Sequence, residues 1–338
     1  MLLKQVLEVF EVLYTPKASG SRICNYLQSL LTDINLNDND SHLRVDGSSD
    51  YDLCVSDGEV SIAYQTIANP SNPSAKTDFI RVMIAGTHGK SQGGDAPTIG
   101  VIGRLGGLGA RPARIGFVSD GDGALAALAV AAKLINMKVQ GDRLAGDVII
   151  TTHVCPDAPT MPHEPVPFMG SPLDMATLNS HEVDKTCDAL LCVDTTKGNL
   201  ICNHRGFAIS PTVRDGYILK TSPDLLQIMQ TTTGQLPQVF ALAQQDITPY
   251  SNGLVHLNSI LQPATATDKP TVGVAITTET AVAGCATGAT HAADVEEAAR
   301  FILEVAKEFT AGRCAFCDED EYGQLLALYG SMSHFRRG

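Results

Sequence analysis

Residues 115–155 read IGFVSDGDGALAALAVAAKLINMKVQGDRLAGDVIITTHVC, and this stretch decides the fold. A short apolar run ends in the acidic turn at residues 119–123, which contains Asp120 and Asp122. A long helix rich in Ala and Leu follows, and a second apolar run ends at His153. Ligands of open α/β sheets bind at the carboxyl ends of parallel strands. We therefore expect these three side chains to gather at one edge of a sheet.

The same pattern extends along the chain on both sides of this stretch. Apolar runs predict strands at residues 51–67 (a pair), 78–86, 188–194, 238–243 and 271–277, and periodic runs predict helices at 2–14, 222–232, 252–261 and 291–309. Strands that alternate with helices from 78 to 309 predict an α/β fold, a three-layer αβα arrangement with a mainly parallel (mixed) sheet. We expect an N-terminal extension of helices and strands over residues 1–75, an α/β catalytic-type domain over 76–311, and a C-terminal helix and tail over 312–338.

Composition narrows the class of protein. The net charge of −13 argues against nucleic acid or an anionic membrane surface as the main partner. No apolar run reaches the length of a membrane span. Nine scattered cysteines, an odd number, indicate free thiols in a reducing cytoplasm, where we expect the protein to be located. We expect a homo-oligomer that acts on a small-molecule or peptide-like substrate.

Polar residues follow most of the predicted strands. The candidates are His88, Asp120, Asp122, His153 and Asp194, and His291 stands just before the last long helix. Imidazole nitrogen and carboxylate oxygen are suitable ligands for divalent metals, zinc above all. We therefore expect these six residues to hold one or two metal ions. The alternative for each residue alone is structural, because Asp and Gly are ordinary turn formers and a strand-end histidine is often a core or capping residue.

A hydrolytic metal site also needs a base and a substrate anchor. The proline-rich loop at 155–172 supplies Asp157 and Glu164 as candidate bases. Arg205 is a candidate anchor for a substrate carboxylate, and a structural salt bridge is its alternative role. Residues 84–91 read IAGTHGKS, with Ile84 where a phosphate loop requires glycine, so we expect no nucleotide. Cys155 and Cys285 leave a cysteine-based enzyme open as a less favoured alternative.

Several longer stretches together resemble the family called domain of unknown function 1177. They are GTHGKSQGGDAPTIGVIGRLGGLGARP, GFVSDGDGA, TTHVCPDAPTMPHEPVPFMGSP, DTTKGN, NHRGFAISPTVRDGY, QDITPYSNGL and CATGATHAADVEEAARF. They cover most of residues 78–305. This resemblance does not indicate which activity the protein has.

From about residue 78 to 309, the order of motifs is also distantly similar to the di-zinc aminopeptidases and related amidohydrolases. The similarity implies a zinc-exopeptidase-like (phosphorylase/hydrolase-like) fold and matches His88, Asp120 or Asp122, Asp194 and His291 to metal ligands. Two departures stand out: Lys90 replaces the aspartate of the first motif, and Val154 and Cys155 stand where a Glu-Glu pair is expected. The resemblance thus implies a metal-dependent hydrolase of an amide bond in a small peptide-like or cyclic amide substrate. A catalytically inactive, peptidase-like binding or assembly protein is the alternative.

Overall fold

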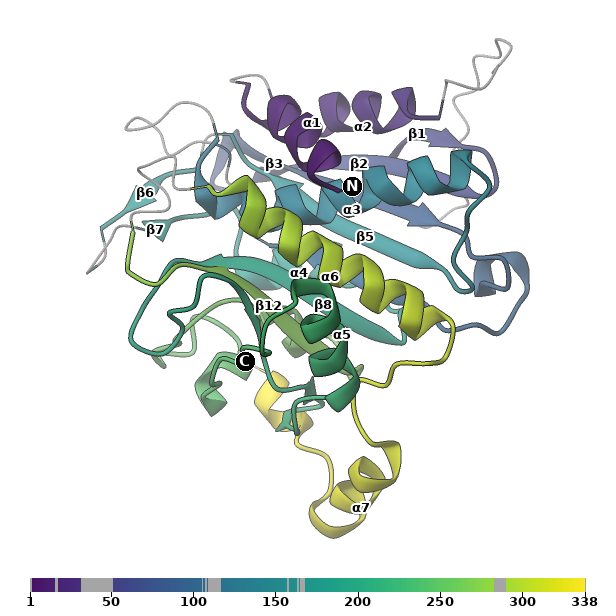
Figure 1. Ribbon diagram of the computed structural model, residues 1–338. Helices are drawn as coiled ribbons and strands as arrows, with labels where there is room; N and C mark the ends of the chain where they lie inside the picture. Colours follow the sequence, from purple (N-terminus) through teal and green to yellow (C-terminus); the bar gives the residue numbers. More distant parts are fainter. Residues whose placement is uncertain are drawn as a thin grey trace.

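The computed structural model describes residues 2–15, 18–31, 51–104, 106, 108, 117–156, 158–162, 164, 168–282 and 290–337. Their main feature is a mixed sheet with the strand order β1-β2-β3-β5-β4-β8-β12-β10-β11, in which β9 also pairs with β12 (Figure 1). The strands are β1 (Asp52–Ser56), β2 (Val60–Asn69), β3 (Asn72–Ile84), β4 (Ile99–Gly103), β5 (Val148–Val154), β8 (Ala189–Thr196), β9 (Gly206–Ile209), β10 (Val213–Arg214), β11 (Tyr217–Ile218) and β12 (Thr271–Thr277). A separate small hairpin consists of β6 (Thr160–Met161) and β7 (Phe168–Met169).

The centre of the sheet is parallel and its flanks are antiparallel. Strands β5, β4, β8 and β12 run parallel to one another, whereas β1, β2 and β3 on one side and β9, β10 and β11 on the other pair antiparallel. The central strands are buried along most of their length, as expected of strands covered on both faces. The predicted α/β fold with a mixed sheet is therefore confirmed, with the parallel part limited to four strands.

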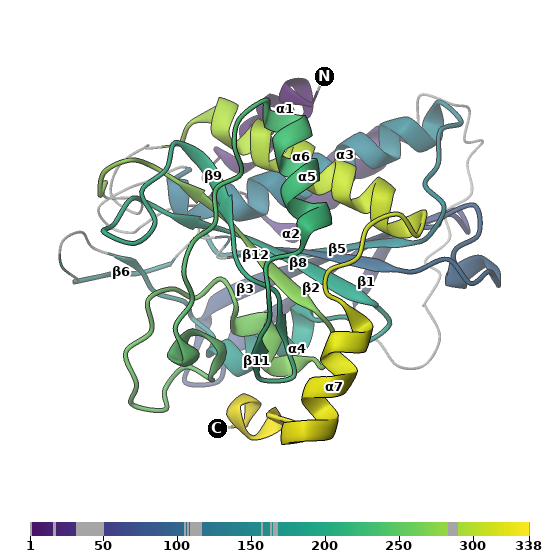
Figure 2. The same ribbon diagram turned by 60° about the horizontal axis from the view of Figure 1, so that its bottom comes forward.

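Helices cover both faces of the sheet (Figure 2). One face carries α1 (Leu3–Leu13), α2 (Gly20–Ser29), α3 (Asp122–Val139), α5 (Pro223–Thr233) and α6 (Ala292–Thr310), which share one large apolar core with the sheet. The opposite face is covered by two 3₁₀ helices, Gln244–Ile247 and Gln262–Ala266, over a second core. Helix α4 (Met175–Glu182) lies on the same face, where its Leu178 packs with Phe79 of β3 in a smaller cluster. Helix α7 (Glu319–Tyr329) follows near the C-terminus. No helix of the described residues is long and apolar enough to cross a membrane.

Four expectations differ from the structure. The strand expected just before the acidic turn is not seen at Phe117 and Val118, and the central strand β4, which was not expected, lies earlier in the chain. The boundary expected between residues 75 and 76 falls inside β3, so the extension and the α/β unit share one sheet. The helix predicted at 252–261 is irregular, because Ser251 and Gly253 adopt positive φ angles that a helix does not allow. The strand predicted at 238–243 makes only an isolated bridge, from Val239 to Ile209.

Candidate functional site

Three residues form a row across the carboxyl ends of the parallel strands. Gly103, the last residue of β4, pairs with Thr152 of β5 on one side and with Val193 of β8 on the other. The next residues, His153, Arg104 and Asp194, therefore stand side by side. Side chains alternate between the two faces of a sheet, so all three lie on the α4 face, and neighbouring strands are about 4.8 Å apart.

Glu182, at the C-terminal end of α4, joins two members of this row. Arg104 Nη1 donates to Glu182 Oε2 over 2.5 Å, and His153 Nδ1 lies 2.5 Å from Glu182 Oε1. Arg104 also donates to Asn179 Oδ1 over 3.0 Å. Burial alone raises the pKa of the Glu182 carboxyl, but Arg104 and His153 outweigh it and hold that pKa below its usual value. Glu182 is therefore a buried anion with two partners.

Asp194 is the third member of the row, and its environment favours the protonated form. The Thr195 backbone N–H donates to Oδ1 over 2.7 Å, and Ser259 Oγ donates to Oδ2 over 3.1 Å. Its side chain is almost wholly buried. Burial raises the pKa of Asp194 to about 7, against the opposing effect of Arg104, and the charge of Asp120 raises it further.

A second group of charges lies beside the row, where α3 begins. Lys197 Nζ lies 3.1 Å from Asp122 Oδ2, and Thr290 Oγ1 donates to Asp122 Oδ1 over 2.8 Å. Burial raises the pKa of both Asp120 and Asp122 to about 6, although Lys197 lowers each. Because Asp120 acts electrostatically on Asp122 and on Asp194, the two groups form one cluster of carboxyls at this edge.

Gly123 explains how the acidic turn reaches this position. A Cβ atom at Gly123 would lie 2.5 Å from the carbonyl oxygen of Val193 and 2.6 Å from that of Arg104. The first turn of α3 is therefore pressed against the ends of β4 and β8, which leaves no room for a side chain. Thr195 Oγ1 ties β8 to the same turn by donating to the Ser119 carbonyl over 2.7 Å.

The described residues do not fit a metal site. Among them, no group of three or more His, Cys, Asp and Glu side chains is arranged to hold a metal ion. The oxygens of Asp122 are engaged by Lys197 and Thr290, those of Asp194 by Thr195 and Ser259, and His153 Nδ1 by Glu182. The candidate base Asp157 and the alternative nucleophile Cys285 lie outside the described residues.

His88 lies apart from the cluster. His88 follows β3, which is antiparallel to β5, and Ile84 pairs with Val148 at the start of β5. His88 is therefore exposed at the opposite edge of the sheet and cannot join His153, because β5 separates them by roughly 20 Å. Its placement differs from expectation because the sequence does not reveal strand direction.

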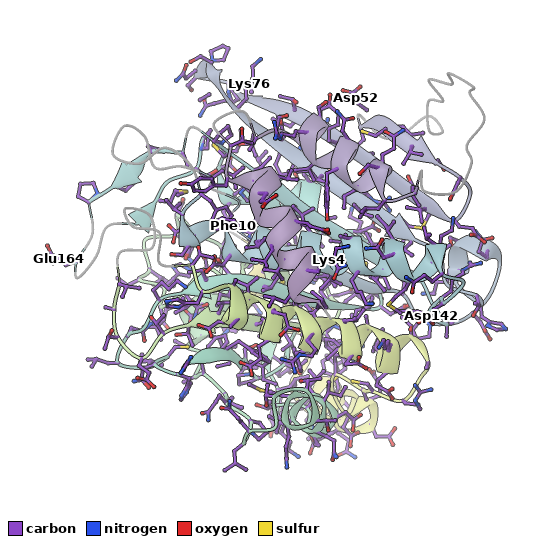
Figure 3. All side chains as sticks on the ribbon, turned by 45° about the horizontal axis from the view of Figure 1, so that its top comes forward. Lys4, Phe10, Asp52, Lys76, Asp142 and Glu164 are labelled. Carbon is purple, nitrogen blue, oxygen red and sulfur yellow. The ribbon has the colours of Figure 1, made fainter. Side chains whose placement is uncertain are left out.

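His291, Glu164 and Arg205 are solvent-exposed. His291 is the N-cap residue of α6, next to Thr290, but its side chain is 57% exposed and its Nδ1 lies 3.3 Å from Asp294. Glu164 belongs to the segment between β6 and β7 and lies at the outer margin of the molecule (Figure 3). Arg205 is exposed just before β9. Of the predicted set, the structure thus brings together Asp120, Asp122, His153 and Asp194.

Sequence reasoning missed Arg104, Glu182 and Lys197. Arg104 directly follows a buried strand in the run IGVIGR, and Lys197 stands three residues after Asp194, so the strand-end rule that found the acids also applied to these cations. No comparable signal marks Glu182, because α4 is short and only weakly amphipathic.

Comparison with known proteins identifies the family. The model of the family described as "Protein of unknown function (DUF1177)" matches residues 68–338. The chain belongs to this family. The match begins at the end of β2 and includes every strand from β3 onward, as well as every residue of the carboxyl cluster. No curated protein matches the sequence.

Three solved structures illustrate what this DUF1177 chain is similar to. Cytosol aminopeptidase from Coxiella burnetii has 12% sequence identity and a TM-score of 0.49, with 89% of this chain and 67% of that one covered. A tomato leucine aminopeptidase mutant has 9% identity and a TM-score of 0.46, with 89% and 61% covered. The bottromycin maturation enzyme BotP in complex with Mn has 12% identity and a TM-score of 0.45, with 90% and 71% covered.

Proposed function

We propose that the protein is a hydrolase of an amide bond in a small substrate, and that the carboxyl cluster at the carboxyl edge of β4, β5 and β8 carries its acid–base chemistry. The observation that carries the proposal is the pair of raised pKa values: about 7 for Asp194 and about 6 for Asp120. Carboxyls that titrate near neutrality at a strand-end edge are typical of catalytic acids and bases.

The two carboxyls suit different roles. Asp120 is the less buried of the two and is mainly ionised at pH 7, so it is the candidate base that takes a proton from water. Asp194 keeps its proton to a higher pH and is the candidate acid for the leaving nitrogen. Burial raises the pKa of both carboxyls, and it raises that of Asp194 further than that of Asp120.

The surrounding residues orient these two groups. Ser259 and the Thr195 backbone N–H fix the Asp194 carboxyl, and Arg104 sets its electrostatic environment. Lys197 neutralises Asp122 and lowers the pKa of Asp120, which keeps the proposed base ionised. The scheme routes no step through a metal ion: Asp122 is paired with Lys197, and His153 Nδ1 is bound to Glu182.

The test is a hydrolysis screen with matched variants. The purified full chain is incubated with N-acyl amino acids, dipeptides and cyclic amides, and the released amine is measured, with and without chelator and with added Zn²⁺ or Mn²⁺. Asp194→Asn and Asp120→Asn are each expected to reduce kcat by at least about 100-fold, whereas Glu164→Gln is expected to retain activity. Hydrolysis that survives both aspartate substitutions contradicts the proposed roles. Activity that appears only with added metal contradicts the metal-free scheme.

The alternative is a peptidase-like protein that binds without catalysis. It predicts that a compound of the same panel binds, as measured by calorimetry, without any release of amine. That outcome would replace the hydrolase proposal.

A further inference from the structure

The C-terminal half of α7 presents apolar side chains to solvent. Residues 325–329 read LLALY, and none of these five residues is buried. Leu328 is 71% exposed and Tyr329 is 66% exposed. Helix α7 also projects from the rest of the molecule, at the bottom of Figure 1. A continuous run of exposed apolar residues on a folded helix marks an interaction surface.

The helix that carries this surface is fixed at both ends to the hairpin of β10 and β11. Tyr322 is the only buried residue of α7, all of which the structure describes. The guanidinium carbon of Arg214 lies 4.0 Å from the centre of the Tyr322 ring, and Arg214 Nη1 donates to Glu319 over 2.7 Å. Just after the helix, the Tyr217 hydroxyl donates to the Gly330 carbonyl over 2.5 Å. The surface is therefore held in one position, which lowers the entropy cost of binding a partner.

Charges of opposite sign lie at the two ends of this surface. Asp318 and Asp320 are exposed at the start of α7, whereas His334 and Arg337 are exposed beyond its end. A second copy of α7 in antiparallel orientation brings the acidic start of each helix to the basic end of the other. The two helix dipoles then also run in opposite directions, which is favourable. The surface is thus complementary to itself, as a twofold contact requires.

We propose that residues 325–329 form a twofold interface with the same residues of a second copy of this chain, so that the protein dimerises through α7. Apolar side chains such as Leu328 and Tyr329 pack across the axis, and Asp320 faces the partner's Arg337. The interface lies on the β10–β11 side of the sheet, beyond β12, and does not include the carboxyl cluster at β4, β5 and β8. It is therefore independent of the proposed hydrolase chemistry.

The size of this surface predicts a weak dimer. Helix α7 has 11 residues and is about 16 Å long. A standard interface takes about 800 Å² from each partner, and a helix of this length supplies only part of that area. We therefore expect a dissociation constant in the micromolar range. Sedimentation velocity of the full chain, from about 1 μM to about 200 μM, should show a monomer–dimer equilibrium. A monomer throughout this range contradicts the proposal.

Substitutions within the surface test whether its apolar side chains hold the dimer together. Leu328→Gln/Tyr329→Gln removes the two most exposed of them and should raise the dissociation constant at least about tenfold. Both side chains are exposed, so the Tm of this variant should match that of the wild type. Leu200→Gln is the control, because Leu200 is 100% exposed but follows β8, and this variant should dimerise as the wild type does. Unchanged association of the double variant contradicts the proposal, and so does weaker association of the control.

Charge reversals test the antiparallel orientation. Asp320→Arg and Arg337→Asp should each weaken the dimer, because each places like charges opposite one another. The double variant Asp320→Arg/Arg337→Asp should restore association, since the pair forms again with its signs exchanged. If the net charge of −13 alone opposed association, Asp320→Arg would strengthen the dimer instead. That result would contradict the proposed pairing.

A symmetric crosslink tests the position of the twofold axis. Ala327 is exposed in the middle of residues 325–329, so Ala327→Cys should form a disulfide with the partner's copy of the same residue under mild oxidation. The variant is made together with Cys317→Ser, because Cys317 is a partly exposed thiol close to α7. Thr231→Cys, exposed on α5, is the control in the same background and should stay monomeric on non-reducing gels. Equal crosslinking of the two variants, or none of Ala327→Cys at concentrations where the protein is dimeric, contradicts the proposed interface.

Discussion

Arg104 donates a hydrogen bond to Glu182 over 2.5 Å, and both side chains are fully inaccessible to solvent. Removing one partner of a buried ion pair leaves the other charge unpaired in the interior. Arg104→Met should therefore lower the free energy of unfolding by about 3–5 kcal/mol. Urea denaturation of the wild type and the variant measures this difference.

The control for this prediction is another pair of the same chemistry. Arg81 donates to Asp184 over 2.7 Å, but both side chains are partly exposed. Arg81→Met should cost about 1 kcal/mol or less, because solvent screens the pair. The double variant Arg104→Met/Glu182→Leu should recover much of the lost stability, since it leaves neither charge unpaired. Equal losses in Arg104→Met and Arg81→Met would show that burial does not set the strength of these pairs.

Close packing at Gly123 leads to a second prediction. A methyl group there meets two backbone carbonyls, so Gly123→Ala should shift the first turn of α3 and cost about 1–3 kcal/mol of stability. The shift also moves Asp120 and Asp122, so activity in the hydrolysis screen should fall with it. Gly323, in the middle of α7, has nothing within 4 Å of an added Cβ atom. Gly323→Ala should therefore be neutral or stabilise by up to about 1 kcal/mol. A tolerated Gly123→Ala, with unchanged activity, would contradict the tight fit.

The sequence predicted three of the four central strands, β5, β8 and β12, but not β4 (Ile99–Gly103), which lies in a glycine-rich segment. Long apolar runs mark the buried parallel strands that were predicted, whereas β4 is short and contains Gly100 and Gly103. Strand direction leaves no such mark, so His88 was grouped with residues at the opposite edge. The partners of the strand-end residues depend on tertiary packing. Glu182 approaches Arg104 only because α4 covers that face of the sheet, and no local pattern encodes this.

The raised pKa of Asp194 predicts a specific dependence of stability on pH. The pKa is about 7 in the folded protein, against an ordinary value of 3.8, so between about pH 4 and pH 7 the folded state binds more protons than the unfolded state. Stability should therefore fall as pH rises through this window. Asp194→Asn cannot titrate, so its stability relative to the wild type should be greater at pH 8 than at pH 4. Urea denaturation across this pH range measures the difference.

Asp184 should behave in the opposite way. Its pKa lies below the ordinary value despite burial, because Thr186 and Arg81 donate hydrogen bonds to the ionised form. The ionised Asp184 carboxyl therefore contributes to stability above the pKa that it has in the unfolded chain, and this contribution is lost as pH falls through its pKa in the folded protein. Asp184→Asn should therefore lose more stability at pH 7 than at pH 3. If Asp194→Asn followed the same direction as Asp184→Asn, the assignment of a raised pKa to Asp194 would be wrong.

Lys197 is the counter-ion of Asp122, so replacing Lys197 should destabilise the protein most at pH values where Asp122 is ionised. The Lys197 side chain is 4% exposed and that of Asp122 is fully buried, so Lys197→Met leaves a buried carboxylate without its cation. Without the lysine, the pKa of Asp122 should rise further above about 6, since Lys197 now opposes the effect of burial. The loss of stability should therefore be about 3–5 kcal/mol at pH 8, where the carboxyl is ionised in the wild type, and smaller at pH 5, where a proton replaces the lysine.

Lys138→Met provides the comparison. Lys138 pairs with the partly exposed Asp57, so this substitution should lower the free energy of unfolding by about 1 kcal/mol or less. A loss for Lys197→Met that is the same at both pH values would mean that Lys197 acts through packing and not as the counter-ion of Asp122.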